Sequence, residues 1–515
     1  MKDRFRPIIK RYRKTFFKKT VYARANPVCL AVDSESFFAF RFFRFFSFWL
    51  VFPFLSRYVM ESLNLFVGDI NSVLWGVCVL IPLLCGTGIF YTIKLRFVQI
   101  RLFPVALRFL FNNATLFGKR ADQTGMSSFQ ALATAVAAQV GTGNVAGAAT
   151  AIVAGGPGAL FWLWLAAFFG MATIFAEAVL AQTYRATGEN NRVVGGPAFY
   201  ISLGLGPKFK PMAVFFSAVA IITMGCMGSL VQSNTVSQAL NHAFDVPLLA
   251  SGLGVAVLSG AVMFGGMGRL AGVTEKLVPF MAGLYLVGGS YVLACHYDQI
   301  IPAFELIFTA AFNPEAVGGG ALGLTVAKAM QFGVARGLFS NEAGMGTTPH
   351  AHAVAKVEHP AEQGLVAIFG VFTTVLIVTF TVLVILVTGV MDFNTTGIEL
   401  TQKAYSVGLG EVGVGFVAVC LFFFAYSTII SWYFFSEQNV RYLFKGRGIF
   451  LYRLIVCAFL VLGAVTHVNL VWTLSDFFNG IMVIPNVIAL ILLHKVVGAS
   501  LKDFEGKLKN SEVSQ

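Results

Sequence analysis

The chain has 515 residues, of which 57% are hydrophobic and only 12% are charged. So few charged side chains cannot cover the surface of a water-soluble protein, so most of this surface must face lipid. The formal net charge of +13 is unevenly distributed along the chain. Residues 1–59 hold 13 Lys and Arg against three Asp and Glu, whereas residues 60–515 hold 24 Lys and Arg against 21 Asp and Glu. The basic character belongs to the N-terminal segment and is not evidence of nucleic-acid binding.

The N-terminal segment, residues 1–59, contains an aromatic run at 37–55, FFAFRFFRFFSFWLVFPFL. The run is short and interrupted by arginines, and it lacks the small-residue cleavage site of a signal peptide. Three interpretations stay open: an extra transmembrane span, a segment lying in the membrane interface, or upstream sequence that is not translated, with Met60 as the true start. We favour the last.

Eleven apolar runs follow, each of about the 20 residues that a helix needs to cross a bilayer core. They are continuous, unlike the alternating stretches of about ten residues that form membrane barrels, so the sequence predicts an all-α membrane protein. The predicted spans are residues 71–93, 127–154, 158–184, 212–240, 247–267, 277–295, 318–346, 364–391, 408–437, 448–466 and 471–494.

Basic residues mark alternate loops between these spans. The loops at 94–126, 185–211 and 438–453 are rich in Lys and Arg, whereas the intervening loops, such as 392–407, are poor in basic residues or acidic. Because short cytoplasmic loops carry the excess of basic residues, this alternation predicts a cytoplasmic C-terminal tail at 496–515.

The second predicted span contains AQVGTGNVAGAATAIVAGGPG at residues 138–158, where glycines are dense enough to break a helix. The spacing Gly141-x-Gly143-x-x-x-Gly147 is not that of a dinucleotide loop, no strand is predicted before it, and no Lys-Ser/Thr pair follows. Taken alone, the glycines also fit a small-residue face for close helix packing.

A second segment, ARGLFSNEAGMGT at residues 335–347, matches residues 138–150 at an offset of 197 residues. Five of the 13 positions are identical, and both segments share N-x-A-G-x-x-T. The two segments lie five predicted spans apart, and an odd separation inverts one repeat relative to the other in the membrane. Inverted repeats with broken helices at matching positions are typical of secondary transporters and mark the binding site.

Two such breaks suit a solute that carries one positive and one negative charge. Unwound backbone survives in a membrane only where protein or a polar cavity surrounds it. N–H groups at the start of a half-helix favour a carboxylate, and free carbonyls favour a cation or an ammonium group. The breaks therefore predict a pocket for a zwitterionic amino acid.

Four motifs occur in order: GTGNVAGAATAIVAGGPGALFWLW, GMATIFAEAVLAQTYR, GGPAFYI and ARGLFSNEAGMGTTPHAHA. Together they resemble the alanine or glycine:cation symporter family over about residues 64–495. The resemblance implies the leucine-transporter-type fold, with two inverted five-helix repeats and one extra N-terminal helix. It also implies sodium-coupled symport of alanine or glycine across a bacterial inner membrane, without enzymatic activity and without a cofactor beyond the coupling ion.

The resemblance divides the chain into an N-terminal extension, an extra transmembrane helix with its cytoplasmic loop, two inverted repeats and a cytoplasmic tail. These expected parts are residues 1–59, 60–126, 127–295, 296–495 and 496–515. The expected partners are a small neutral amino acid, sodium and the lipid bilayer; neither nucleic acid nor an obligate protein partner is expected.

The expected substrate residues lie at the two breaks, with the first segment facing the carboxylate and the second facing the amino group and the side chain. They are Thr142, Gly143, Asn144, Gly337, Phe339, Ser340 and Asn341. The expected sodium ligands are the Ser427 and Thr428 hydroxyls and carbonyls near Ala138 and Gly141, since sodium prefers hard oxygen atoms. The alternatives to a binding role are that these residues serve helix packing, or that the Ser and Thr hydroxyls bond the backbone of their own helix.

Two intramembrane acids are expected to act in gating or in orienting the breaks, because a charge inside a membrane is costly. Glu342 lies in the second break, and Glu177 is expected to pair with a break or with Arg336. His350 and His352 follow the second break without the Cys or carboxylate partners of a metal site, which predicts a surface or gate role and no metal beyond sodium.

Other functions fit these residues less well. A proton-coupled transporter of another small zwitterionic solute stays open, because the sequence does not report the charge of Glu342. An intramembrane enzyme would need a nucleophile, base or metal constellation within the spans, and a channel would need a continuous polar pore. One methyl or hydroxyl changes binding by only ~1–3 kcal/mol, so alanine, glycine and serine are not separated here.

Overall fold

The computed structural model describes residues 57–76, 79–111, 125–188, 191–313, 325–391, 395–466 and 468–513. The aromatic run at 37–55 lies outside these ranges. Residues Met60–Gln515 cluster as one unit of internal contacts. Within the described ranges the fold is almost entirely helical, apart from the short hairpin β1 (Ala186–Thr187) and β2 (Val193–Val194).

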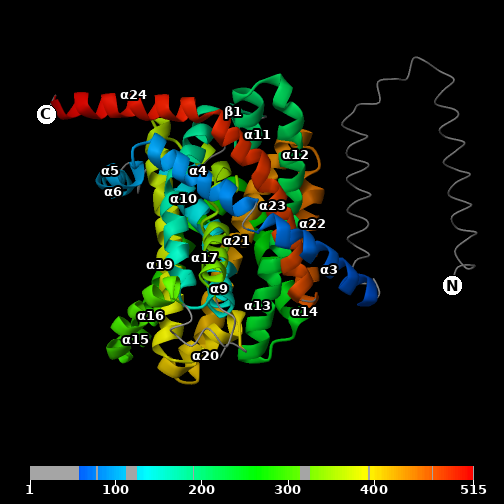
Figure 1. Cartoon of the computed structure of the whole chain (residues 1–515). Coiled ribbons are helices and arrows are strands. Elements are labelled where there is room, and N and C mark those ends of the chain that lie inside the picture. Colours follow the sequence, from blue (N-terminus) through cyan, green and yellow to red (C-terminus); the bar gives the residue numbers. More distant parts are fainter. Residues whose placement is uncertain are drawn as a thin grey trace, which may run out of the picture. The chain divides into compact units, whose positions relative to one another are not determined.

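The first half of the described chain is shown in blue to green in Figure 1. Its helices are α3 (Arg57–Leu74), α4 (Leu80–Lys94), α5 (Val98–Arg101), α6 (Phe103–Phe111), α8 (Ser128–Gln139), the 3-10 turn η2 (Thr142–Asn144), α9 (Ala146–Gly155), α10 (Ala159–Thr183), α11 (Pro197–Phe199), η4 (Tyr200–Gly204), η5 (Pro207–Phe209), α12 (Lys210–Ala220), the π-helical η6 (Ile221–Met227), α13 (Gly228–Phe244) and α14 (Leu248–Met263).

The second half continues from green to red. Its helices are α15 (Gly266–Cys295), η7 (Tyr297–Gln299), α16 (Ile300–Phe312), α17 (Val326–Asn341), α18 (Pro349–Ala353), α19 (Pro360–Val387), α20 (Gly397–Leu409), α21 (Val412–Phe444), α22 (Ile449–Val465), α23 (Val468–Leu492) and α24 (His494–Val513).

Six helices of the described ranges are long and apolar enough to cross a membrane, or seven if the bent pair α8 and η2–α9 is one span. Each of the eleven predicted spans overlaps a helix, but α4, α14 and α22 are short, with 10–17 residues. Helices α16, α20 and α24 fall in segments that were expected to be loops or tail. The protein is thus a multi-pass membrane protein.

The first break follows directly from its sequence. Helix α8 begins at a capping box in which Ser127 and Gln130 each accept from the other's backbone N–H. The helix ends at Gln139, Gly141 is extended, and the chain resumes in η2 and α9 at a bend of 58°. A Cβ at Gly141 would lie 2.7 Å from the Thr428 Oγ1 atom, so only glycine lets α21 approach the break this closely.

The second break lies within the predicted segment 335–347, but after the residues 337–341 that were expected to expose their backbone. Helix α17 continues through Asn341, and the backbone leaves the helix at Glu342, which adopts a left-handed conformation at φ 55°. Gly344 and Gly346 follow with φ of 85° and 80°, where L side chains are strained. The chain then forms only the five-residue helix α18 before α19 begins at Pro360.

Helix α10 packs against α4, α17 and α19 (Figure 1). A buried apolar cluster that includes Leu84, Leu338 and Val487 fills the space between α4, α10, α17 and α23. A second cluster joins Ala343 of the break to α10 and α19. Apolar packing on both sides therefore holds the second break in place.

The close approach of α10 and α17 gives a prediction about stability. A Cβ at Gly333 would lie 2.1 Å from the Ala159 carbonyl oxygen, a backbone atom that cannot rotate away. We expect Gly333→Ala to destabilise the protein by about 1–3 kcal/mol through overpacking, measured as a lower unfolding temperature in detergent. The control is Gly283→Ala on α15, where no atom lies within 4 Å and no loss is expected. Equal unfolding temperatures for both variants would contradict the packing.

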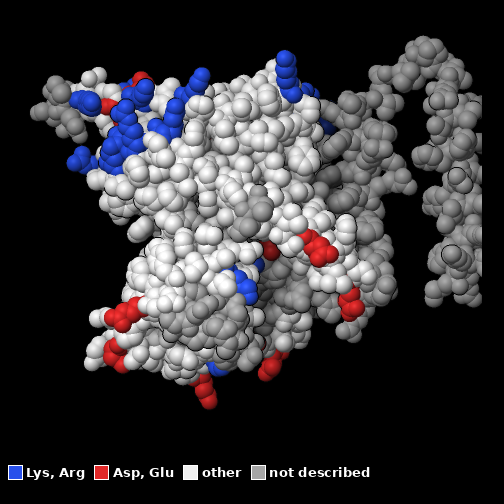
Figure 2. Space-filling model, viewed as in Figure 1, with Lys and Arg blue, Asp and Glu red and all other residues white. Residues whose placement is uncertain are grey.

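Charge divides the visible face of the molecule in Figure 2. Lys and Arg gather at the end where α24 lies in Figure 1, and Asp and Glu gather toward the opposite end, near α20. This is the kind of asymmetry on which the positive-inside rule rests.

Candidate functional site

The two breaks meet inside the bundle. A Cβ at Gly143 would lie 3.5 Å from the Phe339 ring and 3.8 Å from the Ser340 Oγ atom. The Gln139 side chain donates to the Asn341 carbonyl at 2.6 Å, which ties the end of α8 to the end of α17. Segments about 200 residues apart in the sequence therefore form one polar region.

Residues of the first break are buried. They form hydrogen bonds with the backbone of the break itself and with helices that are distant in the sequence. Thr142 and Asn144 have no exposed surface. The Asn144 amide donates to the Gln139 carbonyl at 2.5 Å, and the Thr142 N–H donates to Gln232 of α13 at 3.3 Å. These contacts stabilise the short turn between α8 and α9, whose backbone cannot pair as a regular helix.

Four buried polar atoms in this region have no hydrogen-bond partner among the described residues. They are the Gln139 Oε1, Thr142 Oγ1, Asn144 Oδ1 and Asn341 Nδ2 atoms. An unsatisfied buried polar atom costs about 1–3 kcal/mol. All four atoms belong to residues at the ends of the helices that form the two breaks, and each can still make a hydrogen bond.

The second break contributes differently from the prediction. Gly337 lies within the helical part of α17, and a Cβ there would meet Leu163 of α10 rather than the first break. The Asn341 side chain accepts from Thr374 of α19 at 2.7 Å. Phe339 lies where the two breaks meet, and its ring centroid is 6.4 Å from that of Trp472. Unwound carbonyls are therefore found after Asn341 rather than at residues 337–341, because the backbone stays helical up to that point.

Helix α21 brings two hydroxyls to the end of α8. Thr428 Oγ1 donates to the Ala137 carbonyl at 2.8 Å and lies 3.4 Å from the Ala138 carbonyl, and Ser427 Oγ lies 3.3 Å from the Ala137 carbonyl. Both hydroxyls also bond the Phe424 carbonyl of their own helix. The hydroxyls and carbonyls are hard oxygen atoms, the donors that sodium prefers, although the softer Met281 Sδ atom also lies 3.3 Å from Ser427 Oγ. Ala137, which the sequence analysis missed, supplies the nearest carbonyl.

Glu177 of α10 holds the second break. Its carboxylate accepts from the backbone N–H groups of Gly344 at 2.9 Å and Gly346 at 3.0 Å, and from Asn486 of α23 at 2.7 Å. The alternative pairing with Arg336 is not observed, because Arg336 lies 3.9 Å from Asp476 and beside the rings of Phe339 and Trp472.

Glu342, within the break itself, connects to α21. Its carboxylate accepts from Thr347 Oγ1 at 2.5 Å and from the Trp432 indole N–H at 2.7 Å. Both Glu177 and Glu342 are buried. Each carboxylate thus has hydrogen-bond donors that can stabilise it away from water.

His350 and His352 are buried, so the surface position that was one of their predicted alternatives is wrong. His350 contacts the Thr347 carbonyl and the Asn439 amide, and His352 contacts Gln363. Among the described residues no group of three or more His, Cys, Asp or Glu side chains could hold a metal ion.

Four side chains of the site escaped the sequence analysis: Gln139, Gln232, Thr374 and Asn486. The three amides could have been noticed in the sequence, because an isolated amide within an apolar span costs free energy unless it has a hydrogen-bond partner. Which partner it has depends on the pairing of distant helices, and no local pattern records that pairing.

Comparison with known proteins places this arrangement in a family. The sodium:alanine symporter family profile matches residues 60–515. The chain is 42% identical to the sodium/alanine symporter AgcS of Methanococcus maripaludis, over 86% of this chain and 98% of the relative. It is 40% identical to the probable sodium/glutamine symporter GlnT of Bacillus subtilis, over 88% and 92% of the two chains.

A third relative is the putative sodium/proton-dependent alanine carrier protein YrbD of Bacillus subtilis, 39% identical over 86% of this chain and 93% of the relative. These are transporters, in agreement with the prediction that the protein is not an enzyme. The match extends over nearly all of the described residues, including both breaks. The chain therefore belongs to the sodium:alanine symporter family.

Proposed function

We propose that the protein couples sodium to the uptake of alanine or glycine across a bacterial inner membrane by alternating access. The observation that carries the proposal is the meeting of two helix breaks around four unpartnered buried polar atoms, beside a separate group of hydroxyl and carbonyl oxygens. The first group suits a zwitterion, and the second suits a small hard cation.

The amino acid lies between the two breaks in this proposal. Thr142, Gly143 and Asn144 face its carboxylate, next to the N-terminal end of α9, where backbone N–H groups and the helix dipole favour an anion. Phe339, Ser340 and Asn341 belong to the second wall, with the carbonyl end of α17 favouring the ammonium group. Gly337 acts at one remove, because its missing side chain lets α17 pack closely against Leu163 of α10. The 3.5 Å between the Phe339 ring and a Cβ at Gly143 supports a small side chain.

Sodium binds between α8 and α21 in this proposal. The ligands are the Ser427 and Thr428 hydroxyls with carbonyls of the Ala137–Gly141 segment, including Ala138. When sodium binds, the hydroxyl hydrogens rotate away from the Ala137 carbonyl and both oxygens face the ion. Ion and solute sites then share the end of α8, so filling one site favours the conformation that the other needs.

Alternating access follows from the repeats. In the proposed leucine-transporter-type arrangement, residues 127–295 and 296–495 are the inverted repeats, and Glu177 and Glu342 orient the second break while the repeats move. The basic end of the molecule in Figure 2 supports a cytoplasmic C-terminus. Residues 60–126 supply the extra helix, and we infer that residues 1–59 are not needed for transport.

Two alternatives have an observation behind them. Proton coupling is supported by two buried carboxylates next to the break, Glu177 and Glu342. Glutamine as substrate is supported by the name of one relative, but the narrow space between Gly143 and Phe339 favours a smaller guest.

Counterflow in proteoliposomes tests the proposal. We expect labelled alanine to exchange for internal alanine in sodium buffer, with no exchange when choline replaces sodium, because the cation oxygens lie beside the substrate region. Glycine should compete and glutamine should not. Uptake driven by a pH gradient in sodium-free buffer would overturn sodium coupling, and a lack of alanine counterflow under every condition would overturn the substrate.

A further inference from the structure

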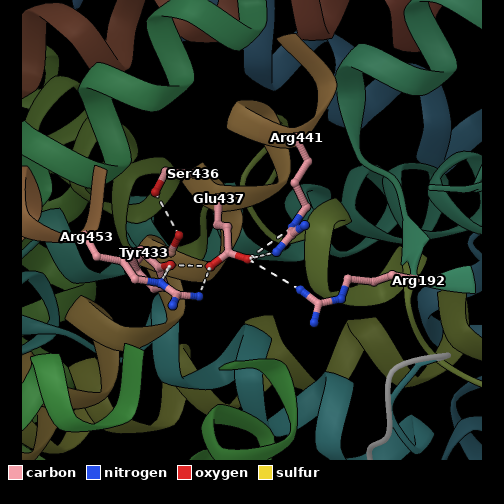
Figure 3. A network of polar contacts seen from close by, with 6 residues as sticks. All are labelled: Arg192, Tyr433, Ser436, Glu437, Arg441 and Arg453. Atoms are coloured by element: carbon pink, nitrogen blue, oxygen red, sulfur yellow. Dashed lines mark hydrogen bonds and ion pairs between the residues drawn. The ribbon is translucent and has the colours of Figure 1, made fainter. Parts of the chain in front are cut away.

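A buried carboxylate near the end of α21 is surrounded by three arginines from different elements (Figure 3). The Glu437 carboxylate lies 2.5 Å from the Arg441 Nη2 atom, 3.4 Å from the Arg453 Nη2 atom and 3.7 Å from the Arg192 Nη1 atom. The Tyr433 hydroxyl also bonds this carboxylate. Arg192 comes from the segment before β2, Arg441 from α21 and Arg453 from α22.

The charges in this cluster do not balance. Among the residues that the structure describes, three guanidinium groups face one carboxylate, which leaves two positive charges in excess. All three arginines are largely shielded, with side-chain exposures of 24%, 18% and 16% for Arg192, Arg441 and Arg453. Burial and the neighbouring Arg441 charge lower the pKa of the Arg192 guanidinium, as expected for a cation that lacks its own anion.

A cavity of about 210 Å³ opens beside the cluster. Its wall includes Arg192, Arg441 and Lys445 on the basic side, and Phe199 and Tyr442, whose rings lie edge to face at 5.1 Å. None of its described lining residues is acidic. Pockets for drug-sized ligands measure about 300–1,000 Å³, so this cavity suits one small charged group rather than a nucleotide.

We propose that this cavity, here called the arginine cavity, binds the phosphate of an anionic ligand the size of a phospholipid headgroup. Arginine recognises phosphate because its planar fork of N–H groups matches two phosphate oxygens. A phospholipid phosphodiester carries one negative charge and so offsets one of the two excess positive charges. The Phe199 and Tyr442 rings form an apolar wall for the carbon atoms that follow the phosphate.

The position of the arginine cavity fits a lipid. Basic pockets between transmembrane helices commonly hold anionic headgroups on the cytoplasmic side. Arg192 and Arg441 belong to two of the basic loops that the sequence predicts on that side. Hairpin strand β1 and helix α11 lie at the same end as α24 in Figure 1, which is the end where Lys and Arg gather in Figure 2. This inference concerns a site apart from the substrate region and does not rest on the transport proposal.

The test is native mass spectrometry of the purified full-length protein with added phosphatidylglycerol. We expect retained phosphatidylglycerol in the parent protein, and about tenfold weaker retention in Arg192→Gln, since a charged hydrogen bond is lost. The matched control is Arg447→Gln, an exposed arginine of the neighbouring loop that does not line the cavity and should change nothing. Lys445→Gln, at the exposed rim, is the second variant in case Arg192→Gln does not fold; it should weaken retention severalfold.

Two further arms identify the source of the phosphate. Weak retention of phosphatidylcholine, together with no displacement of phosphatidylglycerol by inorganic phosphate, supports an anionic lipid. Saturable binding of inorganic phosphate that is lost in Arg192→Gln supports a soluble phosphate ligand of the same site. The proposal is overturned if Arg447→Gln weakens binding as much as Arg192→Gln, or if neither cavity variant weakens it.

Discussion

Replacement of Asn144 by leucine should abolish alanine uptake while the protein still inserts and folds. Leucine has the same branching and the same number of side-chain heavy atoms, so it is the apolar replacement that changes the shape of this fully buried position least. What is lost is the amide that donates to the Gln139 carbonyl and the Oδ1 atom that awaits a partner. We expect uptake to fall at least tenfold, because a hydrogen bond to a charged group is worth about 1.5–3 kcal/mol.

The measurement is initial uptake of labelled alanine by proteoliposomes containing equal amounts of protein. Asn241→Leu is the matched control, since Asn241 is exposed and its amide bonds only to the nearby Val246 carbonyl. Asn341→Leu should behave like Asn144→Leu because both amides lie at the same meeting point. Normal uptake in both Asn144→Leu and Asn341→Leu would remove the substrate site from the two breaks, even if transport itself is confirmed.

Thr428→Val should raise the sodium concentration needed for half-maximal alanine uptake by about tenfold or more. Valine keeps the shape of threonine but removes the oxygen that lies 2.8 Å from the Ala137 carbonyl. A loss confined to sodium affinity, with the same uptake at saturating sodium, is the pattern expected of a ligand to the ion. The measurement is alanine uptake over a range of sodium concentrations at constant ionic strength.

Thr373→Val is the control for this prediction. The Thr373 hydroxyl bonds the Phe369 carbonyl of its own helix, which is the alternative role considered for Thr428. If both valine variants keep the sodium dependence of the parent protein, Thr428 is only a helix residue that bonds its own backbone. The substrate assignments are tested by the Asn144→Leu and Asn341→Leu variants, so this result would leave them intact.

The first break could be predicted closely from the sequence. Its glycines cannot stay helical at low cost, and the structure ends α8 at Gln139, next to Gly141. The matching repeat at residues 335–347 contains the second break, but its exposed backbone was expected at residues 337–341, which remain helical. The physical signal lay later, at Gly344 and Gly346, where the backbone takes positive φ values.

The short helices were missed for a different reason. A search for runs of 20 apolar residues passes over α16 and α20, each with 13 residues. Helix α24 is polar on average, yet its buried residues Val497, Leu501 and Phe504 recur at the spacing of one helix face. A search for amphipathic periodicity would have found it, whereas the partners of Gln139 and Glu177 depend on contacts between distant helices.

One feature of α21 links the two halves of the proposed mechanism. Thr428 and Trp432 are four residues apart, so they stand one above the other on the same side of the helix. The threonine hydroxyl reaches the tip of α8, and the indole nitrogen holds Glu342. Both contacts therefore come from one side of the same helix. A tilt of α21 would move the proposed sodium site and the second break together.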